Sequence, residues 1–516
     1  MRRAFFVFLL LVCLTNIAHG SNKTIVAESK FVVNSENTLY LLKTDIDLKG
    51  STLNIPKNCE IRCEGGSIKN GTIHGDETTL SGKLQNFIDC KLTGSFKSAN
   101  IEYFKHKRNL DLAKIRNLTI NSDCEVEVEE TDNLSILQTI TGNNHTLTLK
   151  WMKPLKGEHA AFNIVGNFSS SNIKIRVTNV SVDKQTHRPA IFMTKRNGYN
   201  IRFANVNYYG SILFHKMYFD VNHFFKEPSY INFDNVHLET DNTTEEYFLV
   251  EYIDRSNFYK PEPYKGEMKF RNCSFITNSD NAYAPISIQM PYTLRYEGCT
   301  FRRNSQKKVC SLETVVPDVM FKDCDMINVG FVDNNSYSNL VKSKNIHIER
   351  CLISQTVVST KLNTRMRALY YSNIYIKDSH FIISGSQFSL DAFDNLTIKK
   401  CRFDITQDCS FNQGFVIYRS YPNDSTKNKC PHIIIDNLEF NYLGSNNKNS
   451  MSCLLEFEEK IDGSDLRKHL KIKDLKVKGF GGKQFVQFIK KDKTERLFWN
   501  ENIKKLEYRK NRWKQN

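Results

Sequence analysis

Several polar side chains stand in short, mostly apolar segments that recur along the chain and could do acid–base chemistry. Two carboxylates, Asp391 and Glu456, fall two repeats apart, with Tyr418 and Arg419 on the repeat between them. A pair of carboxyl groups about 6.5–9.5 Å apart can hydrolyse a glycosidic bond with inversion. The sequence therefore predicts a candidate catalytic set, whose members are Asp391, Glu456, Arg419, Tyr418, Glu251 and His215.

The same segments also allow an elimination reaction on a uronic acid. Such a reaction needs a base, and a cation that neutralises the sugar carboxylate. Arg367, Arg419 and Lys216 are candidates for the base or for the cation. No cofactor is evident, because no cluster of Asp and Glu resembles a Ca²⁺ site, although a lyase could use Ca²⁺. The alternative interpretation of all these residues is an ordinary polar face on a solvated sheet.

One short phrase repeats along the chain and must position these residues. It reads apolar-x-apolar-x-polar-small-x-apolar, and clear copies begin at Met268, Leu294, Val319, Ile346, Ile374 and Leu396. If Val or Leu is allowed at the small position, that position falls at residues 180, 206, 236, 273, 299, 324, 351, 379, 401, 438 and 475. Repeats of this length are typical of a solenoid with one coil per repeat.

The phrase has the period of two that a β-strand requires, so apolar residues two apart share the inside of the coil. The polar pair before the small residue predicts a sharp corner, which Asn, Asp or Gly accommodates. An apolar segment between phrases supplies a third strand in most repeats, as at residues 190–194, 248–252 and 454–458. The prediction is an all-β fold, a single-stranded right-handed parallel β-helix with three strands per coil.

These repeats, over roughly residues 170–480, resemble those of the pectin-lyase-like superfamily of right-handed β-helix proteins. The stretch from Leu48 to Gly75 resembles the opening coils of exported β-helix proteins of gut Bacteroidetes. The resemblance implies a polysaccharide that lies along one sheet, with catalytic residues projecting outward from neighbouring coils. The paired-Asp and Gly-His-Gly signatures of polygalacturonases are missing, which argues against a familiar pectinase.

The start of the chain predicts export. Basic Arg2, an apolar run from Phe5 to Leu14 and the small residues Ala18 and Gly20 are typical of a signal peptide. We expect a periplasmic, outer-surface or extracellular protein with no membrane span. The predicted organisation is a signal peptide (1–20), an N-terminal cap and first coils (21–100), irregular coils (101–170), regular coils (171–480) and a basic C-terminal cap (481–516).

Charge and cysteine usage indicate what kind of partner and core to expect. The formal net charge of +16 suits an anionic partner, and for an exported protein an acidic polysaccharide is favoured over nucleic acid. Lysines that merely solvate strands and turns would give the same charge. There are 14 cysteines, many at the small position of the phrase, so we expect buried thiols in a stack more than disulfides. A disulfide between Cys59 and Cys63 remains an alternative.

Two functions are consistent with the sequence. The first is an exported β-helix protein that binds or processes polysaccharide, either a lyase or a glycoside hydrolase acting on acidic glycans. The second is a non-catalytic cell-surface or glycan-binding structural protein. Carboxylates in a groove on the outward face of the third strand would favour catalysis, whereas a flat aromatic or Asn-lined face would favour binding. The sequence predicts neither substrate nor oligomeric state.

Overall fold

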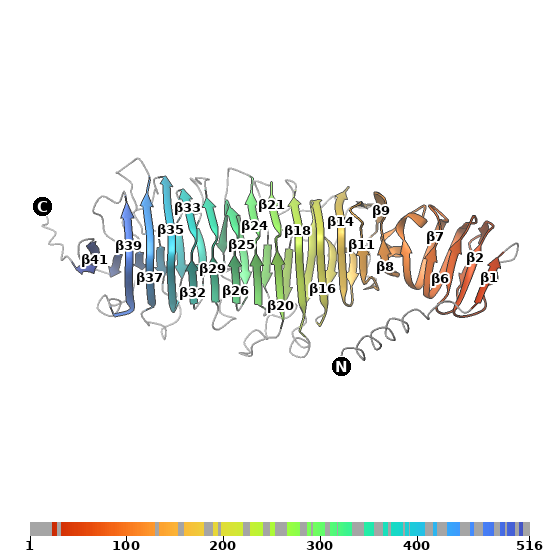
Figure 1. Cartoon of the computed structure of the whole chain (residues 1–516), viewed down its shortest axis with the longest axis horizontal. Coiled ribbons are helices and arrows are strands. Elements are labelled where there is room, and N and C mark those ends of the chain that lie inside the picture. The colour runs from red at the N-terminus through yellow and green to blue at the C-terminus, as the bar shows by residue number, and fades with distance from the viewer. Residues whose placement is uncertain are drawn as a thin grey trace, which may run out of the picture. The chain divides into compact units, whose positions relative to one another are not determined.

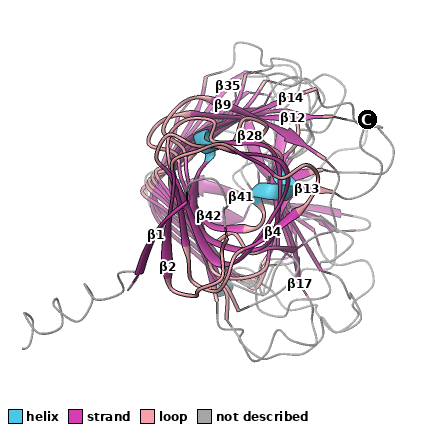
Figure 2. Cartoon of the chain, turned by 90° about the vertical axis from the view of Figure 1, so that its right-hand side faces the viewer, coloured by secondary structure: helices cyan, strands magenta, loops and turns pink. Residues whose placement is uncertain are grey.

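The computed structural model divides the chain into two compact units, residues 1–155 with 161–181 (unit 1) and residues 156–160 with 182–516 (unit 2). The structure describes residues 23–27, 32–129, 134–152, 159–179, 189–194, 198–219, 228–240, 248–252, 266–278, 286–289, 293–304, 310–316, 318–332, 345–355, 365–369, 373–384, 387–391, 393–407, 416–419, 431–443, 455–458, 468–478, 486–490, 493–500 and 505–508. Most of this described part is strand, and very little of it is helix (Figure 2).

Unit 1 is built from parallel strands with two short helical turns. Its elements are β1 (Lys23–Ala27), β2 (Thr38–Leu42), β3 (Ile46–Asp47), β4 (Thr52–Asn54), β5 (Glu60–Cys63), β6 (Ile68–Ser81), β7 (Phe87–Asn100), η1 (Ile101–Tyr103), α2 (Asn109–Leu112), β8 (Ile115–Thr119), β9 (Cys124–Val128), β10 (Leu134–Ser135), β11 (Thr139–Thr141), β12 (Thr146–Trp151), β13 (Ala160–Ile164) and β14 (Phe168–Thr178). Tyr40 of β2 pairs with Ile61 of β5, which pairs with Leu80 of β6, and all three are buried. The coils of this unit therefore stack apolar residue on apolar residue.

Unit 2 repeats a three-strand coil. The first strands are β16 (Asn200–Gly210), β18 (Tyr230–Thr240), β20 (Glu267–Arg271), β23 (Thr293–Glu297), β26 (Asp318–Lys322), β29 (Asn345–Glu349), β32 (Asn373–Lys377), β35 (Asn395–Gln407), β37 (His432–Tyr442) and β39 (Leu470–Lys478). The second strands are β21 (Ser274–Thr277), β24 (Thr300–Arg303), β27 (Asp325–Ile327), β30 (Leu352–Gln355) and β33 (His380–Ser384). In β16, β18, β35, β37 and β39 the first and second strands form one continuous strand that includes the corner residue.

The third strands of unit 2 form two further parallel sheets. They are β15 (Ala190–Thr194), β17 (Leu213–Phe219), β19 (Phe248–Tyr252), β22 (Ile286–Gln289), β25 (Cys310–Val315) and β28 (Val329–Val332), then β31 (Arg365–Leu369), β34 (Gln387–Asp391), β36 (Val416–Arg419), β38 (Leu455–Glu458) and β40 (Val486–Lys490). Figure 1 shows successive coils side by side from β16 to β39. After β40 the pairing changes, because β41 (Lys493–Asn500) and β42 (Lys505–Tyr508) add as antiparallel strands.

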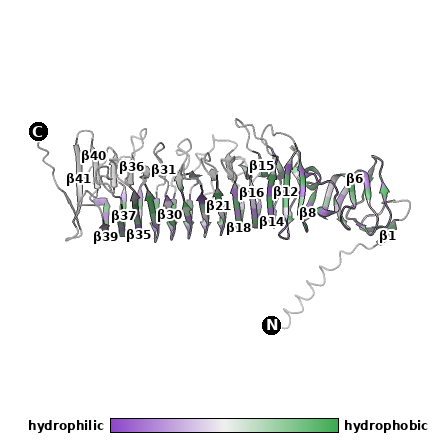
Figure 3. Ribbon diagram, turned by 90° about the horizontal axis from the view of Figure 1, so that it is seen from above, coloured by the Kyte–Doolittle hydropathy of each residue, from purple (hydrophilic) through white to green (hydrophobic). Residues whose placement is uncertain are grey.

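The predicted fold class is confirmed: the fold is a right-handed parallel β-helix with three strands per coil. Its register is also the predicted one, since Val206 pairs with Val236, and Cys401 with Leu438. Hydrophobic and hydrophilic residues alternate along these strands (Figure 3), and the burial pattern of β32 alternates in the same way. A first strand such as β32 therefore buries one face inside the coil and leaves the other to solvent.

The predicted corner lies directly before each small position. All eleven residues at these corners have φ between 49° and 63°, and they are Asn179, Asn205, Asn235, Asn272, Gly298, Asp323, Arg350, Asp378, Lys400, Asn437 and Asp474. This left-handed backbone suits Gly, Asn and Asp. Arg350 and Lys400 depart from that preference, so their positions require another explanation.

Aromatic and thiol side chains form continuous rows inside unit 2. Phe203, Phe233, Phe270, Tyr296 and Phe321 stack ring on ring, with centroids 4.6–5.0 Å apart and planes within 15°. The cysteines whose side chains the structure describes are free, and all but Cys124 are buried; they are Cys59, Cys63, Cys90, Cys124, Cys273, Cys299, Cys324, Cys351 and Cys401. The prediction of stacked thiols is confirmed for these residues, and Cys59 and Cys63 form no disulfide with each other.

Candidate functional site

The third strands carry most of the residues that the sequence singles out. In register, Asp391 of β34 pairs with Arg419 of β36, which pairs with Glu458 of β38. Glu456 pairs with Ile417, two residues before Arg419 on β36, and so is not in register with Asp391. Since parallel strands lie about 4.8 Å apart, Asp391 and Glu458 have backbones roughly 10 Å from each other. The register therefore favours Glu458 over Glu456 as the partner of Asp391.

The other third-strand candidates do not join that row. Tyr418 precedes Arg419 by one residue and pairs with Leu390 and with Phe457. It is therefore in register with these two apolar residues and not with Asp391. Glu251 lies in β19, several coils away, and pairs with Tyr218. The catalytic roles of Asp391, Glu456, Arg419, Tyr418 and Glu251 stay predictions.

His215 does not lie on an outward face, so its predicted placement is wrong. It is 1% exposed, its Nε2 lies 3.0 Å from Thr194 Oγ1, and its ring packs edge-on against Phe203 of the interior stack. Burial lowers the pKa of His215 to about 3, so the imidazole is neutral at physiological pH. Lys216 is equally buried. The physical reason is that β17 is buried on both faces from Leu213 to Met217, so alternation cannot indicate which side chains face outward.

The described outward surface of unit 2 belongs to its first and second strands, and a polar cluster lies there that sequence reasoning missed. Asp404 of β35 is only 6% exposed. Its carboxylate accepts hydrogen bonds from Arg402 Nε (2.9 and 3.0 Å) and from Asn441 Nδ2 (2.7 Å), and lies 2.8 Å from His380 Nε2. We call His380, Arg402, Asp404 and Asn441 the Asp404 cluster.

The charge state of the Asp404 cluster follows from these contacts. Burial raises the pKa of Asp404, but the hydrogen bonds from Arg402, Asn441 and His380 together outweigh it and hold the pKa below its ordinary value. The ionised carboxylate fixes the His380 tautomer with the proton on Nε2, which leaves Nδ1 as an acceptor. His380 and Arg402 are partners in register on adjacent coils. The arrangement thus holds a base and a cation side by side.

The last coil of the same face carries a row of lysines. Lys471, Lys473, Lys476 and Lys478 alternate along β39 on both sides of the corner and are all exposed, and we call them the lysine face. Lys478 contacts Glu439 at 3.0 Å. Within the described part of the chain, the other three make no ion pair. Their charges are therefore available to an anionic ligand.

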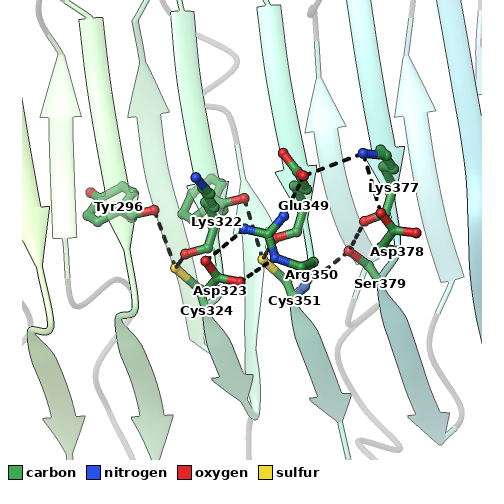
Figure 4. A network of polar contacts seen from close by, with 11 residues as sticks. Tyr296, Lys322, Asp323, Cys324, Glu349, Arg350, Cys351, Lys377, Asp378 and Ser379 are labelled. Atoms are coloured by element: carbon green, nitrogen blue, oxygen red, sulfur yellow. Dashed lines mark hydrogen bonds and ion pairs between the residues drawn. The ribbon is translucent and has the colours of Figure 1, made fainter.

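The corners in the middle of unit 2 are different, because their charges neutralise one another. Figure 4 shows Arg350 between Asp323 and Glu349, with contacts of 2.6 Å to each, and Lys377 next to Glu349 at 3.5 Å. The hydrogen bond from Arg350 lowers the pKa of Asp323. This network explains an arginine at a left-handed corner, since its guanidinium bridges to the corner of the preceding coil.

Amide and aromatic side chains lie on the first strands β29, β32 and β35. Asn345, Asn373 and Asn395 form an amide ladder, in which Asn373 Nδ2 donates to Asn345 Oδ1 and Asn395 Nδ2 donates to Asn373 Oδ1, each at 2.7 Å. Beside them the rings of His347 and Tyr375 stack at 4.8 Å, and Tyr375 is 39% exposed. A flat surface of amides and an aromatic ring is suited to a sugar ring.

Neither a metal centre nor a membrane helix emerges from the described residues. Among them, no three His, Cys, Asp or Glu side chains gather as a metal site would require. None of the helices in the described part has the length and apolar character needed to cross a bilayer.

Comparison with protein-family models, with curated proteins and with solved structures finds no match to this chain. The site must therefore be interpreted from its own geometry.

Proposed function

We propose that this chain is an exported β-helix protein that binds an acidic polysaccharide along the outward face of its first and second strands. The observation that carries the proposal is the lysine face of β39, where Lys471, Lys473 and Lys476 are exposed and make no ion pair with any described residue. The formal net charge of +16 favours the same class of ligand. The signal-peptide pattern and the resemblance to pectin-lyase-like and gut Bacteroidetes proteins support export and a glycan partner.

The amide and aromatic surface supports the sugar part of the proposal. A polyuronate that lies across the coils would place carboxylates near the lysine face and pyranose rings near Tyr375 and the amide ladder. Residues two apart on one strand face are about 6.6 Å apart, so Lys471 and Lys473 can meet separate anionic groups. Binding by this surface needs no groove.

Charge reversal of the lysine face tests the proposal. We expect the variant Lys471→Glu, Lys473→Glu, Lys476→Glu to raise the Kd for a polyuronate at least about 10-fold, since each exposed charge contact contributes up to about 1 kcal/mol. The measurement is titration calorimetry at low and at physiological ionic strength, because screening must weaken the interaction.

The matched control reverses three exposed lysines of unit 1, Lys83, Lys91 and Lys97, for the same change in net charge. We expect the control to bind nearly as well as the unchanged protein. If both variants lost the same amount of affinity, binding would depend on the overall charge of the protein and the lysine face would not be the binding site. If the unchanged protein bound to no acidic glycan, the proposed function would be wrong.

The Asp404 cluster favours a second candidate, a lyase that acts on the bound uronate. His380 Nδ1 would take the proton beside the sugar carboxylate, and the electron pair would form a carbon–carbon double bond as the glycosidic oxygen leaves and takes a proton from water. Arg402 Nε is held by Asp404, while its side chain is half exposed and can hold the substrate carboxylate through Nη1 and Nη2.

The lyase candidate predicts unsaturated products, followed by their ultraviolet absorbance with and without Ca²⁺. We expect His380→Gln to lower this activity about 100-fold, the usual contribution of a general base, while polyuronate binding persists. His145→Gln is the matched control, because His145 also lies beside an aspartate, Asp123 at 3.4 Å, in unit 1. Binding without any product would leave the glycan-binding function and exclude the lyase.

A further inference from the structure

A serine, a histidine and a glutamate meet on the outward face of unit 2, several coils before the lysine face. His237 Nδ1 lies 2.5 Å from Ser274 Oγ, and His237 Nε2 lies 3.4 Å from Glu239 Oε2. Asn278 Nδ2 donates to the other oxygen, Oε1, of Glu239 at 2.9 Å. The imidazole therefore has a hydroxyl at one nitrogen and a carboxylate at the other.

The β-helix itself brings these residues together. His237 and Glu239 stand two apart on β18, on either side of buried Leu238, so they share the outward face. Ser274 is the first residue of β21 and the direct partner of His237 in register on the next coil. Ser274 follows Cys273, the buried small residue of the phrase, so the same corner that turns Cys273 inward turns Ser274 outward.

We propose that Ser274, His237 and Glu239 form a catalytic triad that hydrolyses carboxylic esters. Serine hydrolases use the same arrangement of nucleophile, base and carboxylate. This arrangement occurs on unrelated folds and is recognised by the geometry and the roles of its residues. Glu239 keeps the imidazole proton on Nε2, so Nδ1 has its lone pair toward the Ser274 hydroxyl. Asn278 orients Glu239 as a positioning residue.

The chemical steps balance with water as the only co-reactant. Ser274 Oγ attacks the ester carbonyl while its proton passes to His237 Nδ1, and the alcohol leaves with that proton as the C–O bond breaks. Water then attacks the acyl-serine, gives its proton to His237, and the acid leaves as Ser274 Oγ takes the proton back. The side chains of His237 and Glu239 are 36% and 32% exposed, so a polymer lying across the sheet can bring an ester group to this site.

The test uses the full chain, a chromogenic acetate ester and a fluorophosphonate probe for activated serines. We expect one covalent adduct, on the peptide that contains Ser274, together with ester hydrolysis. Ser274→Ala should abolish both, and His237→Gln should lower both at least about 100-fold. Glu239→Gln should lower kcat with little change in KM, because Glu239 orients the imidazole and does not touch the ester.

Thr300→Ala is the matched control, since Thr300 pairs with Ser274 in register on the following coil and carries a hydroxyl on the same face. We expect this variant to keep full hydrolysis and labelling. Circular dichroism of each variant establishes that the β-helix is retained. Hydrolysis that survives in Ser274→Ala, or a folded unchanged protein that neither reacts with the probe nor cleaves the ester, would overturn the triad.

Discussion

Replacing Phe270 with alanine is expected to lower the free energy of unfolding by about 4 kcal/mol, the usual cost of deleting a buried phenylalanine ring. Phe270 is fully buried in the middle of the aromatic row, 4.6 Å from Phe233 and 4.9 Å from Tyr296 between ring centroids, and Phe275 packs against it edge-on. The loss should be large because each coil buries its apolar face only against the adjacent coils, so the gap interrupts the stack. Urea unfolding followed by far-ultraviolet circular dichroism measures it.

Two variants show whether the effect comes from the row itself. Phe270→Leu keeps most of the apolar volume and should cost less than half as much. Tyr375→Ala removes an aromatic ring from the outward face, where Tyr375 is 39% exposed, and should cost less than about 1 kcal/mol. A loss below about 1 kcal/mol for Phe270→Ala would mean that the aromatic row does not support the coil.

The coil could be predicted from the sequence because one constraint repeats in every copy. An inward residue at positions such as Ile374 and Ile376, a left-handed corner at Asp378 and a small residue at Ser379 must recur wherever one coil stacks on another. The third strands followed from their apolar character, as at Ala190–Thr194 and Phe248–Tyr252.

The functional surface was harder to predict, because the repeated phrase indicates which positions are neighbours but not which outward side chains form hydrogen bonds with one another. His380 and Asp404 are 24 residues apart, and Asp404 and Asn441 are 37 apart, yet the three share one hydrogen-bonded cluster. The coils pair in the same register although the loops between them differ in length, since His380 pairs with Arg402, 22 residues on, and Cys401 with Leu438, 37 residues on. The alternation rule failed at His215 because a strand buried on both faces carries no signal for direction.

The corner sequence also carries information beyond the backbone. Nine of the eleven left-handed corners have Asn, Asp or Gly, which the backbone alone explains. Arg350 is explained by its contacts to Asp323 and Glu349. Nothing in the structure explains Lys400, which is exposed at its corner.

The buried cysteines of the folded protein are expected to react with a thiol reagent at least about 1000-fold more slowly than those of the unfolded chain. Thiolate is the reactive form, and burial raises the pKa of Cys63 to about 12 and that of Cys90 and of Cys401 to about 11. A thiol inside the coil must also wait for the coil to open, which costs several kcal/mol in a stable core. Mass spectrometry after timed alkylation, with and without urea, measures the ratio for each cysteine.

An engineered surface thiol gives the matched reference for this protection. Tyr375→Cys places a cysteine on the outward face of the same coil that carries Ser379 in the thiol row, so it should react at the rate of the unfolded chain. Cys273, Cys299, Cys324 and Cys351 should stay unmodified over the same interval, because they occupy consecutive buried rungs. Rapid alkylation of these four, or disulfide-linked peptides among them, would contradict a row of free thiols. If they stay protected and the chain is exported as proposed, the stacked coils would exclude the oxidant and keep these four thiols reduced in an oxidising compartment.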